Sequence, residues 1–401
     1  MKVSYTAKAL LLLTVVMALF SFVKFDHCYS HSWMSPDEYT HACYSDIPAL
    51  YDARNLVDHV WPYSSATNAI EYPPIMGVVM WATALVSPHS IHGYFLVNVF
   101  LIALLFIASA LLIAKINPRF WYLFPICPAV IGSLYINWDI WAVALVLGSI
   151  LLFERQRYEG GYGASALLLG LSIATKFFPI ILLAPIFIIF YRRKEIASGV
   201  RYIALALGTY ALINLPFALT TPTGWWRFFS MNSHRPADFG SLWYALQLLG
   251  WSPNNINVMA VFCFIAAMAV FCIFLLRIKY TPSLAQVAFI AAAIFTLTSK
   301  VYSPQYVLWL APLGVIALTR RSDRSAFWIW QGSELLYHLA IWEYLATSSG
   351  GGRFGITGVA YAWITLGRIA ATGYFALKIG QSVQNPSFEE ASTPLINSTI
   401  G

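Results

Sequence analysis

The sequence predicts an all-α integral membrane protein built as a helix bundle. Of its 401 residues, 59% are hydrophobic and only 10% are charged, whereas soluble proteins average about 25% charged residues. Apolar runs recur from Ala9 to Leu377 and leave no room for a large aqueous domain between them. We therefore expect one polytopic domain over residues 1–380, followed at 381–401 by a polar tail that we expect to be disordered.

The net charge of +7 does not indicate nucleic-acid binding, because Lys and Arg occur in short clusters between the apolar runs. Such clusters mark the cytoplasmic loops of membrane proteins. They lie at 115–119, 154–161, 191–195, 277–279 and 319–324. The first 24 residues are basic and then apolar and contain no small-residue cleavage site, so an uncleaved first span is expected.

Hydrophobic segments of helical length are regularly spaced along the chain. They lie near 8–24, 73–88, 93–114, 119–136, 139–153, 163–175, 177–191, 199–217, 255–276, 282–298, 304–318, 325–345 and 356–377. With the basic clusters in the cytoplasm, about twelve of these segments cross the membrane and the C-terminus is cytoplasmic. Segment 73–88 breaks the alternation, so a re-entrant or interfacial helix starting at Pro73 and Pro74 is expected there.

This topology places acids in the first outer loop, 25–72, and cations in later outer loops. Acids facing cations suit a reaction between an alcohol and a phosphate-bearing substrate. Cys28 and Cys43 also lie in the first loop, where a disulfide is chemically permitted if the loop is outside the cytoplasm. Spacing alone leaves that pairing open.

Three outer cations are candidates for binding a phosphate. Lys176 lies at a helix break, where the alternative is a lysine that snorkels to the interface. Arg235 can grip phosphate with Asp238 holding it in place, although a local ion pair is an equal alternative. Lys300 begins a segment whose simpler interpretation is a capped helix start.

Further residues of the same face are candidates for contacting the substrate, and Gln305 and Tyr306 in particular can bond sugar hydroxyls. The substrate-binding candidates are Glu71, Tyr72, Asp139, Asp238, Gln305 and Tyr306.

The preferred catalytic acid is Asp46. Residues 47–61 read as an amphipathic helix on the bilayer surface. Its predicted apolar stripe is Leu50, Ala53, Val57 and Trp61. Asp46 precedes Pro48, so we expect it just ahead of this helix and projecting into a cavity. Asp37 and Glu38 nearby keep the assignment of the acid open.

Five stretches between residues 43 and 313 carry a family resemblance. They are "CYSDIPALYDAR", "EYPPIMGVVMWA", "GLSIATKFFPIILLAPI", "RPADFGSLWYAL" and "SPQYVLWLAPL". In this order the sequence resembles the GT-C class of polyprenyl-phosphate-sugar-dependent membrane glycosyltransferases, and within it family 87, the mannosyltransferase-like proteins of actinobacteria. The resemblance implies a bundle whose first outer loop carries the catalytic acid, matched here by Asp46, and an inverting mechanism at the lipid–water boundary.

The chain also departs from that pattern. We expect no large outer C-terminal domain of the kind that some GT-C enzymes carry, and the sequence reads "SPQY" where some family members have paired histidines. No histidine role is therefore carried over to this segment.

The mechanism expected from these residues is sugar transfer without a nucleotide. Asp46 would act as general base on an acceptor hydroxyl, and Lys176, Arg235 and Lys300 would stabilise the leaving phosphate. The donor is a polyprenyl-phosphate sugar, with mannose implied by the resemblance, and the acceptor is a hydroxyl of a lipid or glycan. The expected location is the plasma membrane, with the active site on the non-cytoplasmic side.

No cofactor is expected, because no Gly-rich phosphate loop is present. The eight histidines show no zinc-ligand spacing on one element, so no structural metal is expected, while a divalent ion between Asp46 and the phosphate stays open. The alternatives are a lipid or sugar transporter (flippase) without transfer chemistry, and an inactive accessory scaffold. The absence of an internal repeat and the gathering of charges on one surface favour the enzyme over the transporter.

Overall fold

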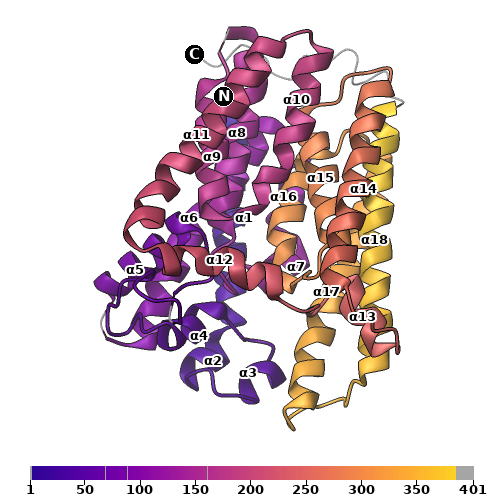
Figure 1. The fold of residues 1–401 in the computed structure, drawn as a ribbon. Coiled ribbons are helices and arrows are strands. Elements are labelled where there is room, and N and C mark those ends of the chain that lie inside the picture. Colours follow the sequence, from indigo (N-terminus) through magenta and orange to yellow (C-terminus); the bar gives the residue numbers. More distant parts are fainter. Residues whose placement is uncertain (1, 68, 88, 160, 385–401) are drawn as a thin grey trace.

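The computed structural model describes residues 2–67, 69–87, 89–159 and 161–384, and over these residues it is all-helical (Figure 1). Eighteen α-helices and four short 3-10 helices follow one another, with no strand in the described part of the chain. This confirms the predicted all-α class.

Most of the longer helices run roughly parallel or antiparallel to one another and form a bundle (Figure 1). The long ones are α1 (Lys2–Val23), α6 (Ile91–Ile116), α8 (Ile140–Glu159), α11 (Ile196–Thr220), α14 (Ile256–Arg277), α17 (Arg324–Ser348) and α18 (Gly358–Gln384). The shorter ones are α9 (Gly163–Thr175), α10 (Leu183–Arg192), α15 (Leu284–Thr298) and α16 (Val307–Ala317). α18 extends past the predicted domain end at residue 380, and residues 385–401 of the predicted tail lie outside the described residues.

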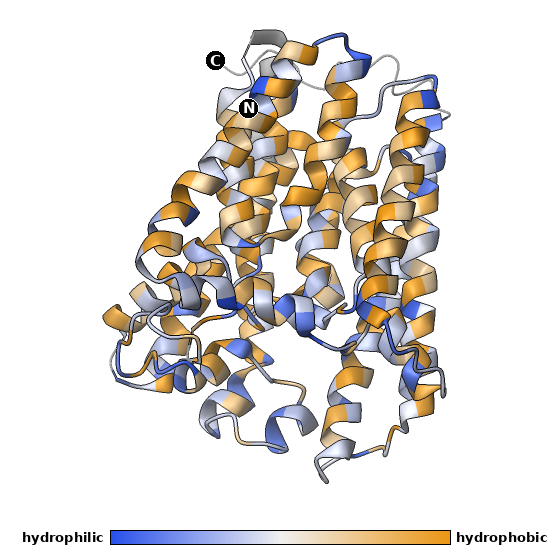
Figure 2. Ribbon diagram, viewed as in Figure 1, coloured by the Kyte–Doolittle hydropathy of each residue, from blue (hydrophilic) through white to orange (hydrophobic). Residues whose placement is uncertain are grey.

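Three helices of the described chain, α6, α11 and α14, are long and apolar enough to cross a membrane. Only 11% of the most apolar window of α11 and 17% of that of α14 are buried inside the protein. Monomeric soluble proteins rarely expose such wide apolar faces, because exposed apolar surface in water favours aggregation. Figure 2 shows the same pattern, with hydrophobic residues along the upright helices and hydrophilic ones mainly near the two ends. These features favour insertion into a membrane.

The first polar loop folds into short helices at one end of the bundle, the lower end in Figure 1. They are α2 (Asp26–Ser30), α3 (Asp37–Thr40) and α4 (Asp46–Ala53), with α5 (Pro74–Val86) beside them. α3 packs against α17, and α4 packs against α6. A disulfide joins Cys28 to Cys43, which settles the pairing that the sequence leaves open.

The predicted amphipathic helix of this loop is wrong in length and in face. α4 ends at Ala53, so Val57 and Trp61 are not part of it. Its buried residues are Ile47, Pro48 and Tyr51, whereas Ala53 is exposed. Asp46 is the first residue of the helix and does not lie ahead of it.

Two further segments differ from the predicted ones. The expected outer loop at 218–241 contains α12 (Pro222–His234), which begins with a proline at its first position and runs across the upright helices in Figure 1; α13 (Leu242–Leu248) follows. The expected span at 119–136 is interrupted, because only η1 (Trp121–Leu123) and α7 (Pro128–Ser133) are helical there. The other 3-10 helices are η2 (Phe178–Leu182), η3 (Pro304–Tyr306) and η4 (Arg321–Asp323).

A buried ion pair connects the last two helices to the segment before η3. Arg368 of α18 donates from Nε to Glu334 Oε2 of α17 over 2.8 Å and from Nη1 to the carbonyl oxygen of Tyr302 over 2.6 Å. The Tyr302 hydroxyl donates to Glu334 Oε1 over 2.7 Å, and the Arg368 guanidinium lies over the Tyr302 ring. Removing one partner of such a pair costs about 3–5 kcal/mol, so these contacts fix residues 302–304, which border the site described next.

Candidate functional site

A cavity of about 870 Å³ lies where the first loop meets the segments around residues 176, 235 and 300–306. Nine of the ten predicted catalytic, phosphate-binding and substrate-binding residues line it: Asp46, Glu71, Tyr72, Lys176, Arg235, Asp238, Lys300, Gln305 and Tyr306. The tenth, Asp139, lies directly behind Lys176. Residues that are up to 260 positions apart in the sequence, from 46 to 306, thus share one cavity.

Asp46 is held in the cavity wall by its neighbours in the chain and by the turn after α7. Its backbone N–H donates to the carbonyl oxygen of Ile136 over 2.7 Å. The Ser45 hydroxyl caps α4 and also donates to the carbonyl oxygen of Tyr135 over 2.7 Å. The Tyr44 hydroxyl donates to Asp46 Oδ1 over 2.9 Å. Backbone and side chain are therefore both fixed, which favours a defined direction for the second carboxylate oxygen.

The surroundings of Asp46 strengthen it as a base. Burial raises the pKa of its carboxyl above the ordinary value, while the hydrogen bond from Tyr44 and the charge of Lys176 act to lower this pKa. The negative charge of Asp139 acts in the raising direction. A carboxylate with a raised pKa accepts a proton from a hydroxyl more readily, which is what general-base catalysis near neutral pH requires. Of the three acids considered for this role, Asp46 rather than Asp37 or Glu38 lines the cavity.

Lys176 lies at the break between α9 and η2, in extended backbone. Its Nζ is 2.6 Å from Oδ1 of Asp139, which is completely buried, and 3.9 Å from the centre of the Tyr72 ring. The lysine side chain is only 10% exposed, so it does not snorkel to an interface. An ammonium group has three N–H donors, and Asp139 engages one side of it. The remaining donors suit an anion in the cavity.

Arg235 and Asp238 form the local ion pair that the sequence leaves as an alternative, and both line the cavity. Asp238 Oδ1 also accepts the backbone N–H of Phe239 over 2.7 Å, so the carboxylate is tethered to its own turn. The pair holds the guanidinium at the cavity wall. A guanidinium has five N–H donors, so the pair leaves others for a phosphate.

Lys300 has contacts that favour a structural role over direct phosphate binding. Its Nζ donates to the carbonyl oxygens of Asn232 (3.0 Å) and Arg235 (2.7 Å) and to Oδ1 of Asn257 (2.6 Å). These acceptors take up the three N–H groups of the ammonium. Lysine side chains commonly bond the last carbonyls of a helix, as Lys300 does at the end of α12. It thereby stabilises the turn that carries Arg235.

Glu71 is also occupied by protein partners. Its carboxylate pairs with Arg54, whose Nε donates over 2.9 Å, and with Arg227 of α12 over 3.5 Å. These contacts join the first loop to α12 and shape the cavity rim.

Gln305 and Tyr306 belong to η3 and border an aromatic wall. The Tyr306 ring stacks on Trp309, with ring centres 3.9 Å apart, and Trp309 stacks on Phe178 at 4.1 Å. Tyr306 and Gln305 both line the cavity, where a hydroxyl and an amide can hydrogen bond a polar ligand.

The cavity lining includes residues that were not predicted as site residues, among them Tyr39, Tyr44, Asn137 and Trp342. The ring planes of Tyr39 and Trp342 are nearly parallel, at 9°, with ring centres 6.3 Å apart. The ring centre of Tyr44 lies 5.5 Å from that of Trp342. Tyr44 and Asn137 could have been found, because one is two residues from Asp46 and the other is two residues from Asp139. Nothing in the sequence distinguishes Trp342 from the other tryptophans of apolar segments.

Comparisons of the chain with protein-family models, with curated proteins and with solved structures found no match. The chemistry of the cavity therefore follows from its own residues: a half-buried carboxylate, two cations that each keep N–H donors, and several aromatic side chains.

Proposed function

We propose that this protein is an inverting membrane glycosyltransferase of the GT-C class, family 87, that uses a polyprenyl-phosphate sugar. It transfers a hexose, with mannose suggested by the sequence resemblance, to a hydroxyl of a lipid or glycan at the non-cytoplasmic face of the plasma membrane. The observation that carries this proposal is the common cavity of Asp46, Lys176 and Arg235. Its volume of about 870 Å³ lies within the range usual for small-molecule sites, roughly 300–1,000 Å³.

Transfer in this cavity is a single displacement. Asp46 takes the proton of the acceptor hydroxyl as the acceptor oxygen forms a bond to the anomeric carbon. The bond between that carbon and the phosphate oxygen breaks, and its electron pair leaves with the phosphate. Attack from the side opposite the leaving group inverts the anomeric centre. A well-placed base contributes roughly 10²–10⁴-fold to the rate of such a step.

Lys176 and Arg235 stabilise the leaving group. The phosphate monoester gains a negative charge as the bond breaks, and cations in a poorly hydrated site lower the energy of that charge more than they would in water. Asp139 and Asp238 hold the two cations in place, and Lys300 supports the turn of Arg235.

The apolar part of the cavity suits the lipid of the donor. Val261 and Phe264 of α14 contribute to the lining, and Val261 is also 57% exposed on the outer surface of the protein. The outward surface of α14 is apolar, so it would face lipid. A polyprenyl chain can therefore leave the cavity beside α14 without crossing a polar surface.

The proposed bundle has about twelve crossings, with α5 as a re-entrant or interfacial helix. α5 has 13 residues and so is about 20 Å long, shorter than a hydrocarbon core of about 30 Å. α9 has the same length, so the re-entrant assignment of α5 rests on the alternation of the basic clusters and not on length alone. The first loop, its disulfide and the cavity then lie on the outer side.

The test is a transfer assay with purified protein, radiolabelled polyprenyl-phosphomannose and a lipid extract as acceptor. We expect Asp46→Asn to lower the transfer rate by about 10²–10⁴-fold, because the amide cannot accept the proton. Asp52→Asn is the matched control, since Asp52 is an exposed acid of the same helix, and it should keep the wild-type rate. Undiminished transfer by Asp46→Asn would remove the proposed base. Movement of intact donor across vesicles without transfer would favour a transporter.

A further inference from the structure

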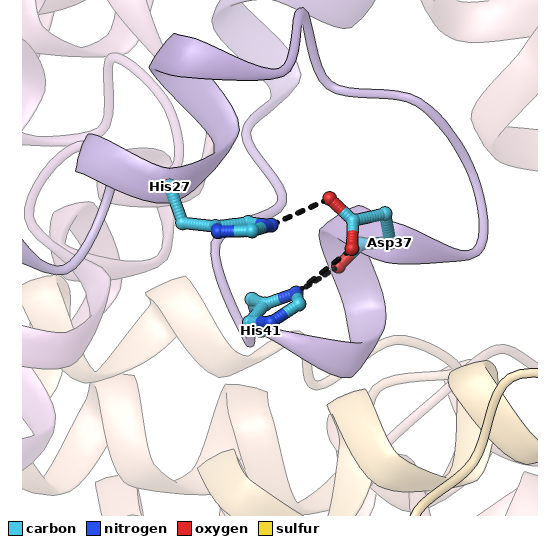
Figure 3. A group of neighbouring side chains, drawn as sticks. All are labelled: His27, Asp37 and His41. Carbon is cyan, nitrogen blue, oxygen red and sulfur yellow. Dashed lines mark hydrogen bonds and ion pairs between the residues drawn. The ribbon is translucent and has the colours of Figure 1, made fainter.

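A second group of chemically reactive side chains lies in the first loop, outside the cavity wall. His27, Asp37 and His41 each offer one ligand atom, and these atoms lie within 4.8 Å of one another. Asp37 Oδ2 is 2.6 Å from His27 Nε2, and Asp37 Oδ1 is 2.9 Å from His41 Nδ1. Figure 3 shows the two imidazoles beside each other, each directed at a different oxygen of the Asp37 carboxylate.

The protein holds this group in place through contacts that need no ion. His27 directly precedes Cys28 and His41 lies two residues before Cys43, so the disulfide closes the loop that carries both rings. The rings stack with their centres 3.5 Å apart. Thr40 donates to the carbonyl oxygen of Gly351 over 2.9 Å, which ties α3 to the loop between α17 and α18. Little conformational freedom remains to be lost when a ligand binds.

The donor set selects a class of ion. Two imidazole nitrogens and one carboxylate oxygen suit Zn²⁺ and similar divalent transition metals, whereas Ca²⁺ and Mg²⁺ prefer oxygen donors only. Ligand bonds of about 2.0–2.2 Å place the donor atoms of a tetrahedral site roughly 3.3 Å apart. The contacts of Asp37 with His27 (2.6 Å) and with His41 (2.9 Å) would therefore widen by about half an ångström on average. The three side chains are 31–37% exposed, which leaves room for this movement and for water as a fourth ligand.

We propose that His27, Asp37 and His41 bind one divalent transition-metal ion of the Zn²⁺ class, which clamps α2 to α3 in the first loop. Tyr39, between two of the ligands, lines the cavity, so the clamp fixes one part of the cavity wall. The ion takes no part in sugar transfer, and the proposal does not depend on the proposed function. The sequence predicts no structural metal, because zinc-ligand spacing is absent on any one element; these ligands come from two elements.

The test uses the full-length chain, purified in detergent without a polyhistidine tag and dialysed against a chelator. Titration with Zn²⁺ should show one saturable site per chain, and Co²⁺ should give the visible absorption of a four-coordinate ion. We expect His41→Gln and Asp37→Asn each to lower the Zn²⁺ affinity by about 10- to 100-fold or more. Changes to residues that only contact metal ligands already lower metal affinity by about that factor. His89→Gln is the matched control, because the His89 ring also lies against another histidine ring, that of His59, with centres 4.6 Å apart, but outside this ligand group. The His89→Gln variant should bind Zn²⁺ as tightly as the wild type.

Thermal unfolding separates lost binding from lost folding. Saturating Zn²⁺ should raise the Tm of the wild type and of His89→Gln, and should leave the Tm of the two ligand variants unchanged. A ligand variant that unfolds early without metal can still be judged by whether Zn²⁺ shifts its Tm. The proposal is overturned if the wild type shows no saturable Zn²⁺ binding, or if the ligand variants bind Zn²⁺ as tightly as the wild type. In either case the three side chains form only a hydrogen-bonded cluster.

Discussion

At the scale of single residues, the proposed chemistry depends on how Asp46 is surrounded. A surface aspartate titrates near pH 3.9 and is a weak base at neutral pH. Burial raises the pKa of Asp46, and the Tyr44 hydroxyl limits that rise by hydrogen bonding the ionised form. The residue is thereby more basic than an exposed carboxylate.

This arrangement predicts the pH dependence of transfer. Since the base must be ionised, the rate should fall as the pH drops through the Asp46 pKa, at a pH above the ordinary value for aspartate. Tyr44→Phe removes a hydrogen bond to the ionised form, so it should raise this pKa and shift the acid limb of the pH–rate profile to higher pH. The profiles of both proteins, measured at saturating donor, test this. A limb that stays in place or moves to lower pH in Tyr44→Phe would show that this contact does not control the base.

Variants of Lys176 and Asp139 can distinguish a role in stability from a role in catalysis. Lys176→Met leaves the Asp139 carboxylate completely buried without its partner, which should lower the free energy of unfolding by about 3–5 kcal/mol and abolish most transfer. Adding Asp139→Asn removes the unpaired charge and should restore much of the stability, while transfer stays low because the phosphate has lost a cation. Denaturant unfolding and transfer assays on the single and double variants measure both effects. Recovery of transfer in the double variant would mean that Lys176 only keeps Asp139 paired.

The sequence was sufficient to predict which charged residues of the expected outer loops belong to the candidate site. Asp46, Lys176 and Arg235 stand out because charged residues are costly among apolar segments and cluster in a few loops. The partner of Lys176 was not predictable, since its approach to Asp139 joins residues 37 positions apart and depends on how α8 packs against α9. The pair of Arg235 and Asp238 was among the alternatives because the two residues are close in sequence. The saturation of Lys300 by carbonyl groups likewise depends on where α12 ends.

At the scale of elements, apolar helices were easier to predict than amphipathic ones. The segment predicted at 163–175 has the bounds of α9, because its apolar run is delimited by glycine on one side and by Lys176 on the other. α12 was missed because its sequence mixes tryptophan, phenylalanine, arginine and serine and has no apolar run. The predicted buried face of α4 was wrong. α4 packs against α6 and residues 135–136, and these contacts bury Ile47 and Tyr51. The periodicity of the sequence alone cannot reveal such contacts.

The short helix α5 carries a prediction about topology. If α5 enters the membrane and returns to the same side, Ser90 before α6 lies outside and Arg155 near the end of α8 lies inside. We expect a cysteine at residue 90 to react with an impermeant thiol reagent added to intact cells, and a cysteine at residue 155 to react only after permeabilisation. The background for both should lack the three free cysteines and keep the disulfide. Labelling of residue 90 only after permeabilisation, with the first loop outside, would mean that α5 crosses fully.

At the scale of the whole molecule, the fold gathers one kind of chemistry at one end of an apolar bundle. The upright helices supply hydrophobic faces, and α2 to α4 with α12 supply polar groups near the lower end in Figure 1. A cavity with a carboxylate, cations and an apolar wall toward α14 can bring a lipid-linked phosphate and a polar acceptor together. That meeting of lipid and water is what the proposed reaction needs.

The most direct test is a structure of the protein in lipid nanodiscs with a non-transferable polyprenyl-phosphate-sugar analogue. The account predicts the phosphate within ion-pairing distance of Lys176 and Arg235, the sugar between the phosphate and Asp46, and the lipid chain leaving beside α14. A phosphate bound away from both cations, or a sugar out of reach of the Asp46 carboxylate, would contradict it.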